Sequence, residues 1–254
     1  MQIRRFPTLQ RLGKIRQFGA KIKDLLYLPG MIQIVPAFLV ESEKEFEHNL
    51  RLVEHDCRLI QVDVLDGSLF PNTCWFDAER IGALKTNVEM ELHLMVENPL
   101  PIIETWKKYV PTFKRAIVHT EMHRPSGVVT GYIKDELKLE VGIALNPESP
   151  LSEVEEVLHM VDQLTVMSVH PGYQGQTFGD PQHGGDRESI LEKIRAVRAH
   201  RKDVVIEVDG GITAELIEPL VRAGANRLCV GSAIFKTPDP TATLKSFNEL
   251  IATL

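Results

Sequence analysis

Short apolar runs rich in β-branched residues alternate with longer amphipathic stretches from residue 31 to the end of the chain. The runs have the length of strands, and the stretches between them have the length and spacing of helices. The predicted strands are Ile32–Pro36, Leu59–Leu65, Val88–Val96, Arg115–His119, Val141–Leu145, Leu164–Val169, Val204–Val208 and Arg227–Val230. The predicted helices are Glu43–Glu54, Pro99–Tyr109, Leu151–Met160, Arg187–His200, Ala214–Ala223 and Thr241–Ile251, with weaker patterns at Asp77–Leu84 and Gly127–Leu137. Eight strands, each followed by a helical stretch, predict a (β/α)8 TIM barrel. A doubly wound open sheet is the structural alternative.

A basic segment precedes this pattern, and we expect two parts: an N-terminal extension over residues 1–30 and a barrel domain over residues 31–254. The extension carries seven basic residues and one acid, with apolar residues at helical spacing: Leu12, Ile15, Phe18, Ile22, Leu25 and Leu26. Such a segment fits a helix packed on the barrel or a partly mobile terminus. It also fits a helix that binds a membrane surface or a partner, or a cleaved organelle presequence, although it contains no serine.

Composition narrows the function classes. The net charge of the 254 residues is −6, and because the extension is basic, the barrel itself is more acidic than that. An acidic body argues against nucleic acid as a partner. The three cysteines form no C-x-x-C pair, so neither a disulfide framework nor a thiolate zinc site is expected, and the predicted location is the cytoplasm. No apolar run reaches the ~18 residues that a transmembrane segment needs.

Polar residues follow or end several of the predicted strands, where the active site of such a barrel lies. Asp63 and Asp209 end two different apolar runs and offer two carboxylates to one pocket. Gln61 lies two residues before Asp63, so both side chains face the same way. His93 closes the third strand, and further candidates follow other strands: His119, Glu121 and His170. Two carboxylates and an imidazole at one barrel mouth are a known way to hold a divalent metal.

Each of these residues also has a structural interpretation. His119 fits a hydrogen-bonded structural histidine as well as a functional one. Asp66, before Gly67, is typical of a turn, and Asp209, before Gly210, also fits a turn. The favoured interpretation is functional because the residues converge on one end of the predicted barrel.

Glycines mark three loops at the same end of the predicted barrel. Gly172-Tyr173-Gln174-Gly175 follows the sixth strand, Gly210-Gly211 follows the seventh, and Gly231-Ser232 follows the eighth. Barrels of this type bind phosphate with backbone N–H groups of the loops after strands seven and eight. Glycine allows the backbone to approach an anion closely. The three loops together predict a phosphorylated ligand.

The ordered motifs of the chain resemble the ribulose-phosphate 3-epimerase family, in the ribulose-phosphate-binding barrel group. The resemblance runs from Ile34 to Phe235. It is carried by QVDVLDGSLFPN, ELHLMVENP, VHTE, GIALNPESPL, VMSVHPGYQGQTF, EVDGGI, AGAN and GSAIF, in the family's order.

The resemblance implies a metal-assisted inversion of the carbon next to a ketone, through a metal-stabilised enediolate. Asp63 and Asp209 would be the acid/base pair and, with His93, the ligands of one divalent ion: Zn, Fe, Mn or Mg. Met95 and Met167 would line the reacting carbon. His93 and the glycine loops would contact the substrate and its phosphate: Gly172, Tyr173, Gln174, Gly175, Gly210, Gly211, Gly231 and Ser232.

The chain departs from the family pattern at several positions. Gln61 stands where the family has a fourth metal ligand, a histidine, and Ala37 stands where the family has a serine. Gln174 replaces a glycine, Leu65 replaces a methionine, and residues Gly179–Asp186 resemble an insertion where a lid would lie. The amide oxygen of Gln61 can still ligate the metal, as a weaker donor than imidazole that favours harder ions such as Mg²⁺ or Mn²⁺ over Zn²⁺. Three outcomes follow: a weaker or different metal, catalysis by the two aspartates without metal, or binding without turnover.

The expected function is that of a ribulose-phosphate 3-epimerase-like isomerase of the pentose phosphate pathway. Its substrate would be a phosphorylated ketose, of the ribulose 5-phosphate to xylulose 5-phosphate type. One alternative is a non-catalytic or impaired phosphosugar-binding barrel. Another is a sugar-phosphate decarboxylase or aldolase of the same group, but those usually carry a lysine between paired acids on strand two, and Asp63-Val64-Leu65-Asp66 has none. Pentulose versus hexulose phosphate, and homo-oligomer versus monomer, stay open.

Overall fold

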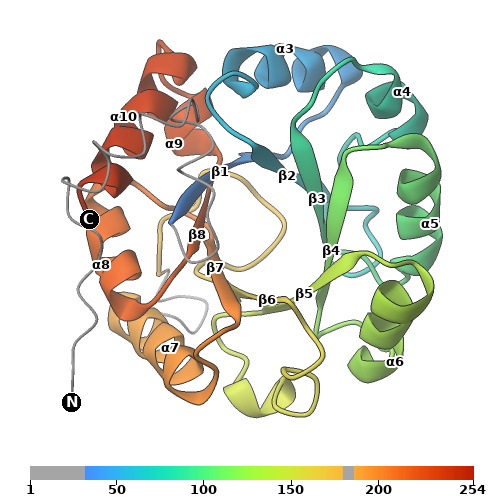
Figure 1. Cartoon of the computed structure of the whole chain (residues 1–254), viewed down its shortest axis with the longest axis vertical. Helices are drawn as coiled ribbons and strands as arrows, with labels where there is room; N and C mark the ends of the chain where they lie inside the picture. The colour runs from blue at the N-terminus through green and yellow to red at the C-terminus, as the bar shows by residue number, and fades with distance from the viewer. Residues whose placement is uncertain (1–31, 180–185) are drawn as a thin grey trace, which may run out of the picture.

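Eight parallel strands close into a barrel in chain order, and Figure 1 shows them as a ring inside a layer of helices. The computed structural model describes residues 32–179 and 186–254. The strands are β1 (Gln33–Phe38), β2 (Leu59–Val64), β3 (Glu89–Leu94), β4 (Phe113–His119), β5 (Glu140–Leu145), β6 (Gln163–Met167), β7 (Val205–Asp209) and β8 (Arg227–Val230). Pairing of β1 with β8 closes the ring, which confirms the predicted (β/α)8 barrel and excludes the open sheet. The predicted extension lies outside the described residues.

The helices that follow the strands lie on the outside of the ring (Figure 1). The α-helices are α3 (Glu43–Val53), α4 (Ala78–Ala83), α5 (Leu100–Tyr109), α6 (Ser126–Gly131), α7 (Arg187–His200), α8 (Ala214–Ala223), α9 (Ser232–Phe235) and α10 (Pro240–Ala252). Several begin at a capping side chain: Ser42 accepts from Glu45 N, and Asp186 and Ser189 form a capping box. A π-helical turn, η2 (Tyr132–Glu136), follows α6.

The predicted helix over residues 151–160 is wrong. The structure has a 3₁₀ turn there, η3 (Leu151–Glu153), followed by further turns. Most of its backbone bonds reach only three residues back, such as Val154 N to Leu151 O and Val157 N to Val154 O. Val154 and Val157 are both buried against the core. β-Branched residues have lower helix propensity, and here burial fixes the segment without a regular helix.

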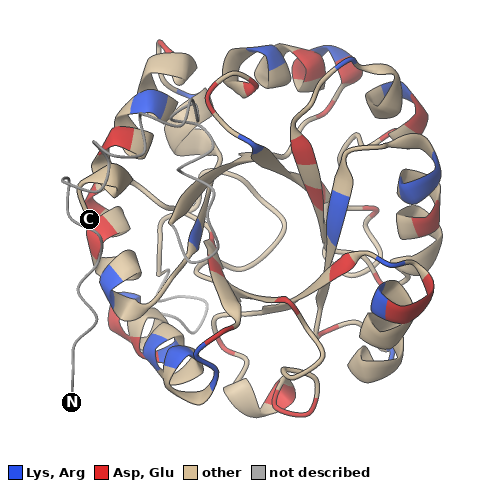
Figure 2. Ribbon diagram, in the orientation of Figure 1, with Lys and Arg blue, Asp and Glu red and all other residues tan. Residues whose placement is uncertain are grey.

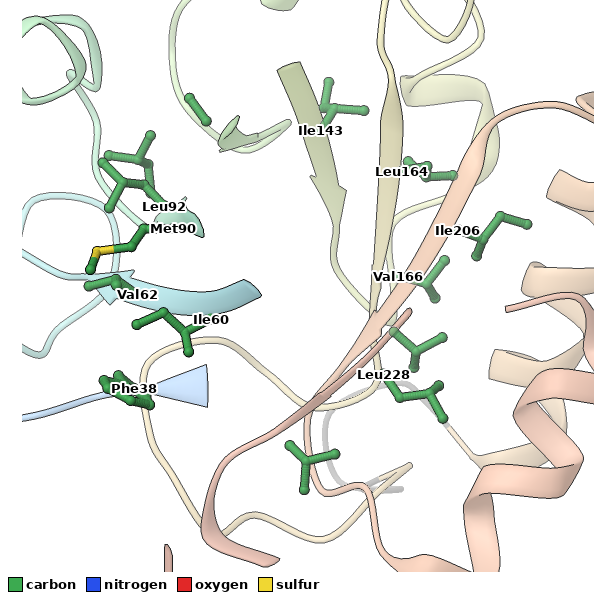
Figure 3. Close-up of a cluster of buried hydrophobic side chains, with 14 of the residues drawn as sticks. Phe38, Ile60, Val62, Met90, Leu92, Ile143, Leu164, Val166, Ile206 and Leu228 are labelled. Atoms are coloured by element: carbon green, nitrogen blue, oxygen red, sulfur yellow. The ribbon is translucent and has the colours of Figure 1, made fainter. Parts of the chain in front are cut away.

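The main core lies between the strands and the surrounding helices (Figure 3). Alternate strand residues point outward into it, and they are almost all aliphatic or aromatic: Phe38, Ile60, Val62, Met90, Leu92, Ile143, Leu164, Val166, Ile206 and Leu228. The residues between them point into the barrel, because side chains of a strand alternate between its two faces. The inward set therefore holds nearly all of the buried polar side chains of the strands.

A network of charged and amide side chains fills the barrel interior near the amino-terminal ends of the strands. Arg115 pairs with Glu91 and Glu140, and Arg227 donates to Gln163 and Gln33. Burial and the neighbouring Glu91 raise the pKa of Glu207 well above its ordinary value. The buried charge of Arg115 is tolerated because Glu91 and Glu140 pair with it. This network thereby supports the polar residues at the carboxyl ends of the strands.

Basic and acidic residues are interspersed along the outer helices, as the ribbon colours of Figure 2 show. Surface ion pairs of this kind, such as Arg51 with Glu47 and Glu54, contribute little stability each. Among the described residues, no helix is long and apolar enough to cross a bilayer.

Candidate active site

A pocket of about 570 Å³, part of it open to solvent, lies at the carboxyl ends of the strands. Both Asp63, at the end of β2, and Asp209, the last residue of β7, line it. The pocket also contains the other expected site residues: His93, Met95, Met167, Gly172, Tyr173, Gln174, Gly175, Gly210, Gly211, Gly231 and Ser232. The two aspartates thus share one cavity, although they are 146 positions apart in the chain.

Gln61 lies fully buried beneath the pocket and joins the two aspartates. Its Nε2 atom donates to Asp63 Oδ1 at 2.9 Å and to Asp209 Oδ2 at 2.7 Å. The alternation along β2 places Gln61 one layer below Asp63 on the inner face. The amide of Gln61 therefore bridges two carboxylates that would otherwise repel each other.

His93 completes the cluster from β3. Its Nδ1 atom lies 3.0 Å from Asp63 Oδ1 and 3.2 Å from Asp209 Oδ2. Burial alone would lower the pKa of His93, but the hydrogen bonds with Asp209 and Asp63 raise it to about 10. Burial and the neighbouring Asp209 raise the pKa of Asp63, against the hydrogen bond from His93. The protonation of Asp63 and that of His93 therefore depend on each other.

A hydrogen-bonded chain continues from His93 away from the pocket. His93 Nε2 lies 2.8 Å from His119 Nε2, and the two rings stack at 22°. His119 Nδ1 lies 3.0 Å from Glu121 Oε2, and Ser149 Oγ donates to the other carboxylate oxygen. Burial lowers the pKa of His119. A neutral His119 that donates through Nδ1 leaves its Nε2 free to accept from His93, which fixes the orientation of the His93 ring.

The cluster brings four polar atoms together at the place where a divalent ion would bind. One donor atom each of Asp63, His93 and Asp209 lies within 4.8 Å of the other two, and Gln61 Nε2 lies 3.5 Å from His93 Nδ1. Three of the donors suit such an ion. The fourth, Gln61, presents N–H groups to the centre in the orientation described.

Cys229 is a site residue that sequence reasoning missed. It lines the pocket from β8, and its Sγ donates to Gln61 Oε1 at 3.1 Å. Burial raises the pKa of its thiol well above the ordinary value, so it stays protonated and able to donate. The sequence offered one signal for Cys229, the alternation of side chains along β8, which places it on the inner face of the barrel. Six other pocket residues also carried no chemical signal of their own: Leu39, Val169, Pro171, Gln176, Ile212 and Ala37, the last noted only as a departure from the family.

The glycine loops come together on one side of the pocket. Gly211 has φ +58°, and a Cβ added there would lie 2.4 Å from the backbone nitrogen of Phe178. Only glycine therefore lets the loop after β7 pack this closely on the loop after β6. The side chain of Gln176 donates to His170 O and Tyr173 O and so fixes the loop after β6. This arrangement suits the backbone binding of an anion.

The remaining candidates have structural partners. His170 lies beside the pocket, 3.1 Å from Glu148 Oε1 and edge-on to the ring of Phe70. Asp66 forms a turn, since its Oδ1 accepts from Ser68 N at 2.9 Å. The predicted lid insertion falls largely on residues 180–185, which lie outside the described residues.

Comparison with known proteins agrees with the motifs. The profile of the Ribulose-phosphate 3 epimerase family matches residues 33–235. A protein named Ribulose-phosphate 3-epimerase from Bacillus subtilis is 31% identical over 233 residues, covering 82% of this chain and 94% of its own length. One of the same name from Aquifex aeolicus is 32% identical, covering 76% and 84%. The chloroplastic Ribulose-5-phosphate-3-epimerase of Arabidopsis thaliana is 33% identical, covering 85% and 76%.

More distant solved structures share the fold. The 3-hexulose-6-phosphate synthase from Salmonella typhimurium has a TM-score of 0.65 at 15% identity, covering 87% of this chain and 99% of its own. The KGPDC from Streptococcus mutans, solved with D-R5P, has a TM-score of 0.66 at 10% identity, covering 87% and 98%. At these identities the likeness extends to the barrel alone. The match over 33–235 and the relatives above 30% identity are what decide the family: this chain belongs to the ribulose-phosphate 3-epimerase family and is an epimerase.

Proposed function

We propose that this protein inverts the carbon next to the ketone of a phosphorylated ketose, with ribulose 5-phosphate and xylulose 5-phosphate as its substrate and product. The proposal rests on one observation: Asp63, on β2, and Asp209, on β7, line the same pocket. Inversion at one carbon needs an acid/base group on each face of a planar intermediate. Four strands lie between β2 and β7 in one direction around the ring, and two lie between them in the other, so the two carboxylates approach a bound sugar from different sides.

The reaction follows from these two carboxylates. One aspartate takes the proton from C3, and the electrons of the broken C–H bond move toward the C2 carbonyl to give an enediolate. The second aspartate then donates a proton to the opposite face of C3. Gln61 and His93 hold both carboxylates in place through hydrogen bonds of 2.7–3.2 Å. General acid–base transfer of this kind contributes about 10²–10⁴-fold to the rate.

The donor set supports a bound divalent cation, Zn, Fe, Mn or Mg. Asp63, His93 and Asp209 would hold it, with Gln61 as the fourth donor if its amide oxygen faces inward. Such an ion supplies Lewis-acid stabilisation of the developing negative charge on the substrate oxygens. The protein's own part is to fix these ligands: His119 and Glu121 orient His93 from behind.

The rest of the pocket matches a phosphorylated sugar in its chemistry. Met95 and Met167 offer an apolar lining beside the aspartates, while the glycine loops offer backbone N–H groups for the phosphate. The names of the relatives from Bacillus subtilis and Aquifex aeolicus favour a pentose phosphate.

Proton exchange at C3 tests this function directly. Ribulose 5-phosphate is incubated with the protein in heavy water, with Mg²⁺, Mn²⁺ or Zn²⁺ supplied in turn, and followed by NMR. We expect deuterium at C3 of xylulose 5-phosphate, because the proton returned comes from a carboxyl in contact with solvent. Absence of exchange under all conditions, with ribulose 5-phosphate still bound, would contradict the proposal and favour a phosphosugar-binding barrel.

A further inference from the structure

The amide of Gln61 is the best-connected group of the cluster, and its hydrogen bonds with Asp63, Asp209 and Cys229 all use it in one orientation. Its two N–H groups serve Asp63 Oδ1 and Asp209 Oδ2 at 2.9 and 2.7 Å. The opposite orientation, without a cation, would put an amide oxygen at those distances from two carboxylate oxygens. Three acceptors in contact repel each other, so hydrogen bonding alone selects the orientation with nitrogen inward.

The other end of the same amide has its own partner. Cys229 Sγ lies 3.1 Å from Gln61 Oε1 and donates to it. Both residues are buried, Gln61 fully and Cys229 to 2% exposed, so no water competes for the carbonyl. With the amide reversed, the thiol would face an NH2 group and could offer only a weak sulfur acceptor. Cys229 therefore favours nitrogen inward from the opposite side.

A divalent cation requires the reverse arrangement. Amide groups ligate through oxygen, and an N–H aimed at a cation is repelled by it. To supply a fourth donor, Gln61 must rotate its amide and give up the bonds to Asp63, Asp209 and Cys229. A histidine would need no such rotation, because a neutral imidazole nitrogen already presents its lone pair.

We infer that Gln61, held by Cys229, bridges the two carboxylates in place of a cation and so makes this site a weak binder of divalent metal. A cation would hold Asp63 and Asp209 together through its charge. The Gln61 amide holds them together through two hydrogen bonds instead. This deepens the proposed function and rests on it for the role of the two aspartates. The residue pair Gln61–Cys229 then sets how far the enzyme depends on added metal.

Metal affinity measured without substrate tests the inference. The full-length protein is stripped with chelator, checked by metal analysis, and titrated with Zn²⁺ and Mn²⁺ by calorimetry. We expect Gln61→His to bind Zn²⁺ about 10–100-fold more tightly than the wild type. Cys229→Ala removes the thiol donor and should tighten binding about 2–10-fold, whereas Cys229→Ser keeps a donor and should not tighten it. Cys57→Ala, which alters a cysteine just beyond α3, is the matched control and should change nothing.

The outcomes separate cleanly. Wild-type affinity within threefold of Gln61→His, or no difference between Cys229→Ala and Cys229→Ser, overturns the inference. If Gln61→His does not fold, the cysteine pair still decides. A second readout is the ¹⁵N spectrum of the Gln61 side-chain amide, which should shift on saturation with Zn²⁺ as the NH2 group leaves the carboxylates; an unchanged signal also contradicts the inference. Because no step uses substrate, these results stand apart from any failure of the C3 exchange test.

Discussion

Functional and core side chains alternate residue by residue along the same strands. On β2, Ile60 and Val62 enter the outer core, while Gln61 and Asp63 enter the barrel. This alternation is readable from sequence, because the period of a strand is two. The contact between His93 and His119 was not readable, since it depends on the register of β3 against β4, which shifts at Met90. The orientation of Gln61 depends in the same way on a partner 168 positions away.

The pH dependence of stability tests the role of a single residue, Glu121. Burial alone would raise its pKa, but hydrogen bonds from His119 and Ser149 lower it to about 2, against an ordinary 4.5. A lowered pKa contributes stability that is present above pH 4.5 and is lost as the pH falls toward 2. Glu121→Gln should therefore cost on the order of 1–3 kcal/mol of unfolding free energy at pH 7, and much less at pH 2.

Urea unfolding at pH 7, 4 and 2 measures this difference. The exposed Glu155→Gln serves as the control and should stay within about 0.5 kcal/mol of the wild type throughout. A cost for Glu121→Gln that stays constant down to pH 2 would show that the lost charge is not responsible.

At the scale of elements, strands and loops were easier to predict than the short helices. Apolar runs closed by aspartate or histidine placed β2, β3, β4 and β7 within a few residues of their observed bounds. The segment after β5 was predicted helical and is not, because two buried valines and short-range turns replace a helix. Glycine pairs did mark the pocket loops, since a turn with positive φ next to another backbone excludes any side chain.

Gly211→Ala tests that element directly. The new Cβ would lie 2.4 Å from Phe178 N and 2.7 Å from Gln176 O, at a backbone φ of +58°. The loop after β6 must move, so we expect a loss of more than about 1 kcal/mol in stability and a raised KM for a phosphorylated substrate. Gly127→Ala is the matched control, because its Cβ would meet only Val157 at 3.6 Å. Equal behaviour of the two variants in thermal unfolding and kinetics would contradict this account of the loops.

The described residues form one closed ring whose core belongs to no single element. The outer core draws on all eight strands and on the helices around them (Figures 1 and 3). Sequence periodicity predicted this closure because eight strand–helix units are what a barrel of this kind requires. It did not place the extension or the proposed insertion, which lie outside the described residues. Cytoplasmic location stays a prediction from the sequence.

Ile206→Ala tests the shared core. Ile206 lies on β7 and is fully buried between the barrel and its helices. Its truncation should cost about 2–5 kcal/mol, and the unfolding should stay a single transition because the core is continuous. Val128→Ala, at a side chain 69% exposed, should cost less than about 0.5 kcal/mol. Two separate transitions in calorimetry, or similar costs for both variants, would contradict a single core.

The central claim is that Asp63 and Asp209 transfer protons on opposite faces of the same carbon. The most direct measurement follows Asp63→Asn and Asp209→Asn in heavy water, starting separately from ribulose 5-phosphate and from xylulose 5-phosphate. Each variant should lose interconversion by at least about 10²-fold while keeping C3 exchange for one epimer only, with the surviving epimer opposite in the two variants. Interconversion at a near-wild-type rate in either variant would contradict the claim.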